Sequence, residues 1–441
     1  MLFRSDELID GGTTIDDAVR IAQIAEATGQ VDYINTSIGV ATASLFMIEA
    51  SMHIPPGYAL FIPSAFRKAV DLPVVGVGRF KDPLQAERAI AEGHCDLVGV
   101  VRGQIADPDF AAKSRAGETD DIRLCLSCNQ ECVGRMGLNR WLGCIENPRT
   151  GREAQGVGTV RLGVKPKQVM IVGAGPAGLQ AAIAAARNGH HVTVFEKEAD
   201  AGGQVRIAAS VPNRAEFGDM IRNQLNECDR LGVKFEFGVG VWPGLVEERR
   251  PDHVVVATGA EPQRPWWVPG DADARNGGNV CDVREVLDGS LGERGPASGQ
   301  HVVVVDEIGF HHATSVAEVL ADRGCHVEIV TNGMVVGQDL GITLDMENWW
   351  MRAHAKRIVQ STDLVPMGMA DGELTLLHHP TGTNRTRRPD WVVLAVPPSP
   401  VEWLYRDLKA AGVSVQRVGD CVAPRRAHAA VIDGERVGAA L

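Results

Sequence analysis

The feature that most constrains the fold of this 441-residue chain is a glycine-rich turn directly after an apolar run. Residues 168–172 are typical of a strand, and 177–188 are typical of a helix. At this junction Gly173 makes the turn, Gly175 lets the backbone approach a pyrophosphate, and Gly178 permits close helix–strand packing. The helix N-terminus adds about half a positive charge toward the phosphates. The pattern predicts a Rossmann-like dinucleotide-binding domain.

The downstream sequence specifies the nucleotide further. Glu196 ends the next apolar strand, 18 residues past Gly178, where a carboxylate can accept hydrogen bonds from a ribose. Later turns favour FAD, although the threonine–glycine turn alone would also fit an ordinary strand end. The candidate residues from these turns are Gly203, Gln204, Thr258, Gly259 and Asp420.

Four of the nine cysteines are crowded into a glycine-containing segment: Cys125, Cys128, Cys132 and Cys144. Thiolates are the soft ligands that hold iron–sulfur clusters, and a cubane needs four of them. Structural zinc is the rival, but its ligands usually come as two short pairs with a longer spacer between them. Three cysteines within eight residues and a fourth apart favour a [4Fe-4S] cluster.

Residues 1–117 alternate short β-rich runs with amphipathic runs, which predicts a parallel sheet with crossover helices. Three full strand–helix units and a strand fragment at 2–4 are recognisable, about half of a (β/α)8 barrel. The expected strands are 31–35, 73–77 and 96–101, and the expected helices are 15–28, 63–70, 82–92 and 108–115.

Two loops of this half barrel carry an arginine beside a glycine. They are Gly78-Arg79 and Arg102-Gly103, each after an expected strand. In flavin-binding barrels a phosphate sits beyond the last two strands, and the planar guanidinium suits it. The alternative is that both arginines are salt-bridged loop residues.

A third βα unit begins at residue 301, but its phosphate turn lacks the glycine pair. Asp306 and Glu307 stand where a pyrophosphate would approach, and like charges repel. The next strand ends in Thr331, so no ribose-binding acid follows. The sequence therefore disfavours NAD(P) binding in this unit.

Charge and hydropathy narrow the class of protein. The net charge of −12 argues against nucleic acid or an anionic membrane surface as the main partner. The sequence shows no signal peptide and no apolar run of membrane-spanning length, which predicts a cytoplasmic location. The expected domains are a partial FMN-type barrel, a cluster loop with linker, an FAD-type domain and an inserted NAD(P)-like domain: 1–117, 118–164, 165–267 with 396–441, and 268–395.

In this order the motifs resemble the family of trimethylamine dehydrogenase and 2,4-dienoyl-CoA reductase, which joins an old-yellow-enzyme type FMN barrel to a [4Fe-4S] loop and two nucleotide-binding domains. The stretches that carry the resemblance are 75–84, 96–109, 121–133, 144–152, 172–180 and 418–426. The resemblance implies an FMN site, four cluster ligands, an FAD pocket that holds ADP in one branch, and a substrate-side histidine at His53. The implied FMN contacts are Gly78, Arg79, Arg102, Gly103 and, near the ring, Arg4.

The resemblance leaves three functions open. The altered turn at Asp306 resembles the amine-dehydrogenase branch, in which a small-molecule substrate reduces FMN and electrons leave the cluster for an electron-transfer flavoprotein. The alternative is an NAD(P)H-dependent enoate or dienoyl-CoA reductase. A third is a non-catalytic electron-transfer subunit or a truncated product, since the first half of the family's barrel is not in this chain. A partner chain completing the barrel, in a homo- or hetero-oligomer, is then expected.

Overall fold

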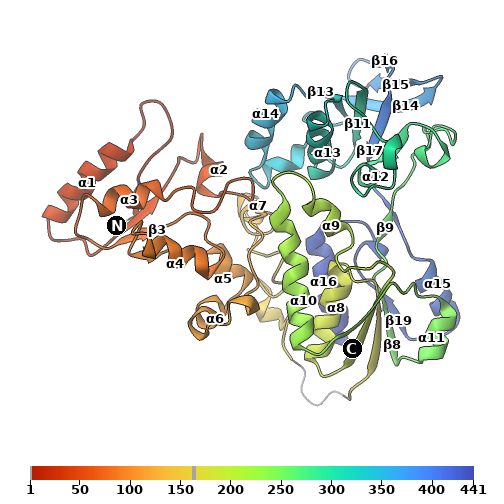
Figure 1. Ribbon diagram of the computed structural model, residues 1–441, viewed down its shortest axis with the longest axis horizontal. Coiled ribbons are helices and arrows are strands. Elements are labelled where there is room, and N and C mark those ends of the chain that lie inside the picture. Colours follow the sequence, from red (N-terminus) through yellow and green to blue (C-terminus); the bar gives the residue numbers. More distant parts are fainter. Residues whose placement is uncertain (1, 161–164) are drawn as a thin grey trace. The chain divides into compact units, whose positions relative to one another are not determined.

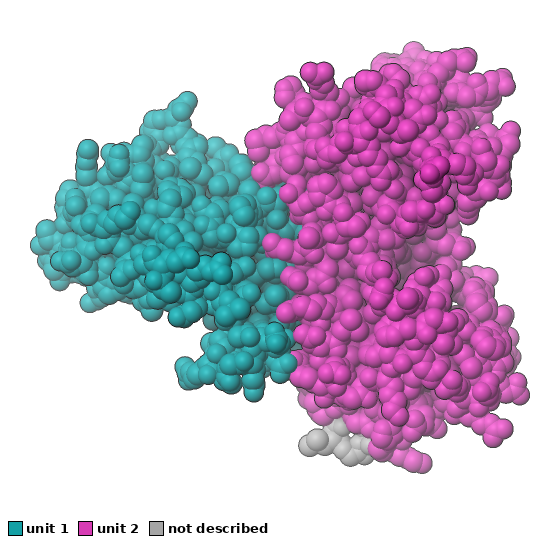
Figure 2. Space-filling view, viewed as in Figure 1, with its two compact units in different colours: residues 1–154, 342–345 teal, residues 155–341, 346–441 magenta. Residues whose placement is uncertain are grey.

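The computed structural model describes residues 2–160 and 165–441 (Figure 1). Met1 and the end of the expected linker, 161–164, lie outside the described residues, as does the side chain of Arg4. The chain divides into two compact units, shown in different colours in Figure 2. Unit 1 comprises 1–154 and 342–345, and unit 2 comprises 155–341 and 346–441. Among the described helices, none combines the length and the apolar character that crossing a bilayer requires.

Unit 1 is built on four parallel strands in the order β1-β2-β3-β4. Their bounds are Leu2–Arg4, Ile34–Ser37, Val74–Gly76 and Leu97–Val98. The helices of the unit are α1 (Ile15–Ala27), α2 (Leu45–Ile48), α3 (Phe61–Arg67), α4 (Pro83–Ala91), α5 (Arg102–Ala106), α6 (Phe110–Ala116) and α7 (Val133–Gly137). Strands and helices alternate in parallel order, which confirms the predicted half of a (β/α)8 barrel.

Local sequence sets the helix starts in this unit. Helix α1 begins with a capping box, in which Thr14 and Asp17 each accept the other's backbone N–H. Helix α4 begins where Asp82 accepts the N–H of Leu84 at 2.8 Å, with Pro83 at the first helical position. The expected strand at 96–101 is only two residues long, because the chain turns into α5, a short helix that the sequence did not predict. A cluster of buried side chains joins α1, α3 and the sheet: Ala18, Ala22, Ile34, Ile62, Phe66 and Val74.

Unit 2 contains the predicted FAD-type fold as a five-stranded parallel sheet in the order β19-β8-β5-β6-β7. The strands are β5 (Gln168–Val172), β6 (His191–Glu196), β7 (Lys234–Phe237), β8 (His253–Val256) and β19 (Val415–Arg417). The helices are α8 (Pro176–Arg187), α9 (Gln204–Ala209), α10 (Asp219–Arg230), α11 (Pro243–Arg249), α15 (Trp403–Ala410) and α16 (Ala427–Ala440). Helices α8 and α16 pack very closely, since a Cβ at Gly434 would lie 2.3 Å from the Ala177 oxygen.

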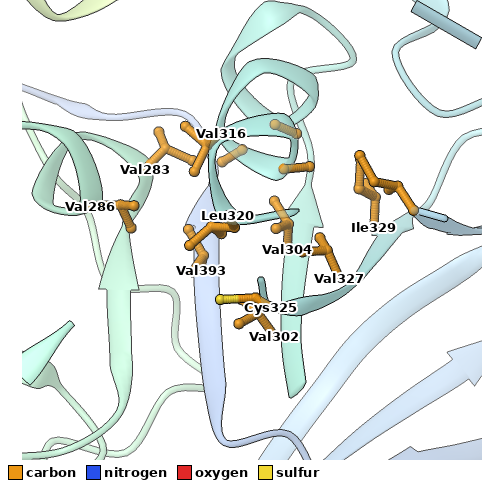
Figure 3. Close-up of a cluster of buried hydrophobic side chains, with 14 of the residues drawn as sticks. Val283, Val286, Val302, Val304, Val316, Leu320, Cys325, Val327, Ile329 and Val393 are labelled. Atoms are coloured by element: carbon orange, nitrogen blue, oxygen red, sulfur yellow. The ribbon is translucent and has the colours of Figure 1, made fainter. Parts of the chain in front are cut away.

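A second parallel sheet of unit 2 has the order β10-β17-β11-β12-β13 and confirms the second Rossmann-like fold. Its strands are β10 (Val280–Asp282), β11 (His301–Asp306), β12 (His326–Thr331), β13 (Val359–Ser361) and β17 (Trp391–Ala395), with helices α12 (Val283–Leu287), α13 (His311–Asp322) and α14 (Met346–Ala355). Val316 and Leu320 of α13 lie over Val304, Val327 and Val393 of the sheet (Figure 3).

Smaller sheets complete unit 2. An antiparallel sheet of β14 (Leu364–Ala370), β15 (Glu373–His378) and β16 (Thr383–Arg387) follows β13. Strands β9 (Ala260–Glu261) and β18 (Ser399–Pro400) pair antiparallel where the chain leaves the first Rossmann-like fold and returns to it. The antiparallel additions were not predicted from the sequence.

Candidate functional site

The four cysteines predicted as cluster ligands meet in one pocket of unit 1. Cys125, Cys128, Cys132 and Cys144 are free thiols, and all four line the same cavity. The loop can turn this tightly because Ser127 and Asn129 adopt positive φ angles of 52° and 56°. Such left-handed residues reverse the chain between successive cysteines, so that their side chains point to a common centre.

Backbone amides are directed at these sulfurs. The Ser127 N–H donates to Cys125 Sγ at 3.3 Å. The backbone amides of Gln130, Val133 and Asn147 lower the pKa of the remaining thiols, against the effect of burial. Hydrogen bonds to sulfur are among the features that set the potential of an iron–sulfur cluster. The loop thus offers four sulfurs in one pocket, one of which accepts a backbone hydrogen bond.

The electrostatics of the pocket fit a cationic metal centre. Burial and the nearby Cys125 thiolate together raise the pKa of Cys132 to about 11, while the positive charge of Arg102 opposes the rise. Burial also places the pKa of Cys128 and Cys144 well above the ordinary thiol value. Four thiolates close together would repel each other in this apolar surrounding unless metal cations bind them. The donor set therefore fits an iron–sulfur cluster.

Asn129 connects the cysteine loop to the rest of unit 1. Its buried side chain donates to Glu49 O at 2.6 Å and to Thr343 O at 3.1 Å, and it accepts from Arg102 Nη1 at 2.6 Å. Arg102 also donates to Ala50 O at 2.7 Å and lines the cysteine pocket. Sequence reasoning missed Asn129, although an asparagine between two ligand cysteines is a residue that readily adopts positive φ.

The loop proposed to bind the flavin phosphate, Gly78-Arg79, lies beside Gly57. The Gly57 N–H donates to Gly78 O at 2.7 Å, and a Cβ at Gly78 would lie 3.3 Å from the Gly57 Cα. Arg79 follows in the left-handed region, with φ of 62°. Gly103 allows close packing, since a Cβ there would lie 2.7 Å from Val100 Cγ1.

The hydroxyl of Tyr58 interacts electrostatically with the arginines of both loops, Arg79 and Arg102. Burial raises the pKa of the Tyr58 hydroxyl to about 12, while the positive charges of Arg102 and Arg79 oppose that rise. Both guanidinium groups therefore act on the same buried hydroxyl, which donates to Met47 O. Tyr58 carried no signal in the sequence, because it belongs to no phosphate-binding motif.

His53 lies in a buried polar cluster of unit 1. Its Nε2 is 3.6 Å from Asp345 Oδ1, and both side chains are almost fully buried. The same carboxylate accepts hydrogen bonds from Ser51 and, at 2.7 Å, from Thr343. The cluster gives His53 a structural partner that sequence reasoning could not find, because Asp345 is far away along the chain.

The glycine turn of the first Rossmann-like fold matches its expected geometry. Gly173 has φ of 106°, and a Cβ there would lie 2.4 Å from Ala257 O. A Cβ at Gly178 would lie 1.9 Å from Gly173 O, so only glycine fits between helix and strand. Around Gly175, by contrast, no described atom lies within 4 Å of such a Cβ. That open side is where a pyrophosphate can approach.

The other residues predicted to bind the nucleotide lie in the same Rossmann-like fold. Glu196 accepts the Ala174 N–H at 2.8 Å, which places its carboxylate at the turn, and a Cβ at Gly203 would lie 3.7 Å from the Gly175 Cα. Thr258 and Gly259 follow β8, and Asp420 follows β19, so these three residues lie beyond the C-terminal ends of two neighbouring strands of the same sheet. Gln204 begins α9, and its amide lies 3.5 Å from Ala260 O. Burial raises the pKa of Asp420, which accepts the Arg425 N–H at 3.1 Å.

Two family descriptions match this chain. Residues 5–121 match the NADH:flavin oxidoreductase / NADH oxidase family, and residues 167–396 match the pyridine nucleotide-disulphide oxidoreductase family. The N,N-dimethylglycine/sarcosine dehydrogenase of Chromohalobacter salexigens is 33% identical, over 98% of this chain and 67% of that protein. The chain belongs to the trimethylamine dehydrogenase and old-yellow-enzyme-like family of flavin oxidoreductases.

Other members of the family show its range. The NADH oxidase of Thermoanaerobacter brockii is 33% identical over 95% of this chain and 62% of its own length. A solved 2-naphthoyl-CoA reductase complex has a TM-score of 0.89 and 27% identity, and covers 100% of this chain and 65% of that one. The chain thus spans about two thirds of the length of these relatives. Its two domain families are those of FMN- and FAD-dependent oxidoreductases.

In this member of the family the second Rossmann-like turn is occupied by the chain's own carboxylate. Asp306 is fully buried at the end of β11, and its Oδ1 accepts the N–H groups of Ile308 at 3.1 Å and Gly309 at 2.8 Å. Burial raises the pKa of Asp306, and these hydrogen bonds oppose the rise. The turn amides that would face a pyrophosphate are therefore already bonded to Asp306.

Proposed function

We propose that this protein is a flavin and iron–sulfur oxidoreductase of the amine dehydrogenase or demethylase type. The observation that carries the proposal is the convergence of four thiols in one pocket that Arg102 of the barrel fragment also lines. The carboxylate in the second Rossmann-like turn favours an amine substrate over NAD(P)H as the electron source. The 33% identical dimethylglycine/sarcosine dehydrogenase supports the same choice.

The residues divide into three sets in this proposal. Cys125, Cys128, Cys132 and Cys144 would bind the [4Fe-4S] cluster. Backbone at Gly78 and Gly103, with Arg79, Arg102 and Arg4, would hold FMN. FAD, or ADP in the same pocket, would be held by Gly173, Gly175, Gly178, Glu196, Gly203, Gln204, Thr258, Gly259 and Asp420. When bound, FMN would supply two-electron chemistry and the cluster single-electron transfer.

The chain's own residues orient these groups. Arg102 joins the barrel fragment to the cysteine loop through Ala50 and Asn129, so that one side chain fixes the position of both sites. His53, with its side chain held against Asp345, would act as a positioning residue for the loop that contains it. We propose a cytoplasmic location, an electron-transfer flavoprotein as acceptor, and an oligomer or a partner chain that completes the barrel.

An NAD(P)H-dependent reductase is the alternative that a specific observation favours, namely the 33% identity to an NADH oxidase. Cofactor and reduction assays on anaerobically purified chain separate the two. We expect the protein to contain iron, labile sulfide and FAD or ADP. An N-methylated amine should bleach the flavin once a partner chain completes the barrel, and NADH should not. Rapid bleaching by NADH would favour the reductase. Zinc in place of iron would contradict the proposal as a whole.

A further inference from the structure

A side chain of the second Rossmann-like fold reaches the predicted nucleotide site of the first. Arg284 is the second residue of helix α12, and its Nη1 lies 3.3 Å from Ala260 O and 3.5 Å from Gln204 Oε1. Ala260 directly follows the turn Thr258-Gly259, and Gln204 begins α9. Three of these residues are predicted to bind the nucleotide, whereas Arg284 belongs to no nucleotide-binding motif.

The direction of the Arg284 side chain is set by Asp282. This aspartate caps α12 by accepting the backbone N–H of Arg284 at 2.9 Å, as part of a capping box with Glu285. Its carboxylate also accepts from Arg284 Nε at 2.8 Å and from Nη2 at 3.2 Å. The two side chains are only 12% and 2% exposed. The paired bond therefore occupies one edge of the planar guanidinium, while Nη1 is directed at the first fold.

The two contacts of Nη1 are longer than ordinary hydrogen bonds. Bonds from N–H to oxygen most often measure about 2.9–3.0 Å between the heavy atoms. The contacts to Gln204 and Ala260 measure 3.5 and 3.3 Å. A donor that is largely removed from water gains by forming a shorter bond when a ligand supplies an acceptor. Nη1 of Arg284 is therefore a candidate ligand donor at the nucleotide site.

The order of the strands indicates which part of a nucleotide would lie here. The sheet of the first fold runs β19-β8-β5-β6-β7, with all its strands parallel. Glu196, the predicted ribose acid, ends β6, and the pyrophosphate turn at Gly175 follows β5. Gly259 and Asp420 follow β8 and β19, on the other side of that turn. A nucleotide with its adenosine at Glu196 and its pyrophosphate at the turn would therefore continue toward β8 and β19 with whatever follows the second phosphate.

Arg284 lies on this far side of the turn. It is beside Ala260, which comes after β8, and its positive charge acts on Asp420, which comes after β19. Burial raises the pKa of Asp420, and the N–H and charge of Arg425 and the charge of Arg284 oppose that rise. ADP ends at its second phosphate, whereas FAD continues with a ribityl chain and an isoalloxazine ring whose oxygens accept hydrogen bonds. The donor is therefore placed where FAD would reach and ADP would not.

We propose that Arg284 is a nucleotide-binding residue which the second Rossmann-like fold contributes to the first, and that its Nη1 selects FAD over ADP by donating to the riboflavin half of FAD. This inference rests on the proposed function and chooses between the two nucleotides that it allows. It also gives the second fold, whose own turn is filled by Asp306, a part in holding the cofactor of the first.

Nucleotide binding by the full chain tests the proposal. Iron and sulfide are measured in anaerobically purified protein, and the nucleotide that it releases on heating is identified by chromatography. FAD and ADP are then titrated separately into nucleotide-free protein by calorimetry. The variant is Arg284→Met, and the double variant Asp282→Asn/Arg284→Met removes the carboxylate that the single change would leave buried without its charged partner. The matched control, Arg352→Met on α14, breaks a similar paired bond to Glu318 within the second fold.

We expect the wild type to release FAD, and both Arg284 variants to bind FAD roughly tenfold more weakly, as for the loss of one hydrogen bond. Their binding of ADP should stay unchanged, and the control should bind both nucleotides like the wild type. An equal loss of FAD and ADP would assign Arg284 to the pyrophosphate or to the fold and overturn the proposal. Unchanged FAD binding, or a wild type that releases only ADP, would overturn it too. An iron-free preparation with the same Arg284-dependent preference for FAD would refute the proposed function and still support this inference.

Discussion

Replacing Asn129 with alanine tests whether one side chain holds the cysteine loop in place. Asn129 donates two hydrogen bonds, to Glu49 O and Thr343 O, and accepts one from Arg102. Its backbone has φ of 56°, where alanine is less stable than asparagine. The substitution therefore removes the bonds and adds a conformational cost, and the two effects have to be separated.

Asn139 provides the matched control. It lies in the same loop region with φ of 53°, but its side chain is exposed. Asn139→Ala should cost only the conformational term, about 1 kcal/mol. Asn129→Ala should cost the same term and about 3 kcal/mol more, at ~1 kcal/mol for each of three hydrogen bonds. The difference between the variants isolates the hydrogen bonds.

The assay is anaerobic urea denaturation followed by the loss of cluster absorbance. With a slope of about 1–3 kcal/mol per M, the extra loss should lower the midpoint for Asn129→Ala by roughly 1–3 M relative to Asn139→Ala. Asn129→Asp should be no more stable than Asn129→Ala, because its second oxygen would face the carbonyl oxygens of Glu49 and Thr343 in place of the donor that binds them. Equal midpoints for the two alanine variants would refute the role given to Asn129.

Three further predictions test the nucleotide turns and the barrel fragment. Gly178→Ala should lower the stability of the fold, because its Cβ would lie 1.9 Å from Gly173 O. Gly175→Ala should fold normally, because the space around it is open, but should lose FAD or ADP in a cofactor assay. Full nucleotide content in Gly175→Ala would contradict this prediction. Asp306→Gly frees two turn amides and should bind NADH measurably in a fluorescence titration, while Asp306→Asn, which still accepts these N–H groups, should not. Because the pKa of Tyr58 is raised to about 12, its contribution to stability is present below pH 10 and lost as the pH rises toward 12. Tyr58→Phe should therefore make the urea midpoint depend less on pH between about pH 9 and 11.5. An unchanged pH dependence would count against burial as the cause of the raised pKa.

The sequence predicted the parts of the fold that local chemistry determines. Helix α1 was expected from its apolar spacing and α4 from its Asp-Pro start, both within a residue or two of the observed bounds. The first Rossmann-like strand was expected with its observed bounds, because an apolar run between a charged residue and a glycine turn leaves little choice. Helix α5 and the antiparallel strands β14–β16 were missed, since short helices and exposed strands depend on contacts that periodicity does not reveal.

The candidate site, like the fold, was predicted only where local sequence determines it. Cysteine spacing predicted four thiols in one pocket because a compact loop can hold them without help from distant residues. The residues that support the loop were not predicted, because Thr343 and Asp345 come from a segment about two hundred residues away that belongs to unit 1. Such contacts depend on the tertiary fold, and hydrophobic period and motif spacing carry no trace of them.

Asp306 shows how a lost motif can still be informative. Loss of the glycine pair alone would leave a turn whose amides could still attract an anion. The structure adds that a buried carboxylate accepts those amides, so the site is filled by the chain itself. Since β11, α13 and the sheet around them remain well packed, the unit keeps its fold while the Ile308 and Gly309 amides of its turn are bonded to Asp306 and not to a nicotinamide dinucleotide. On the proposed function this leaves the first Rossmann-like fold as the nucleotide site and the cysteine loop as the exit for electrons.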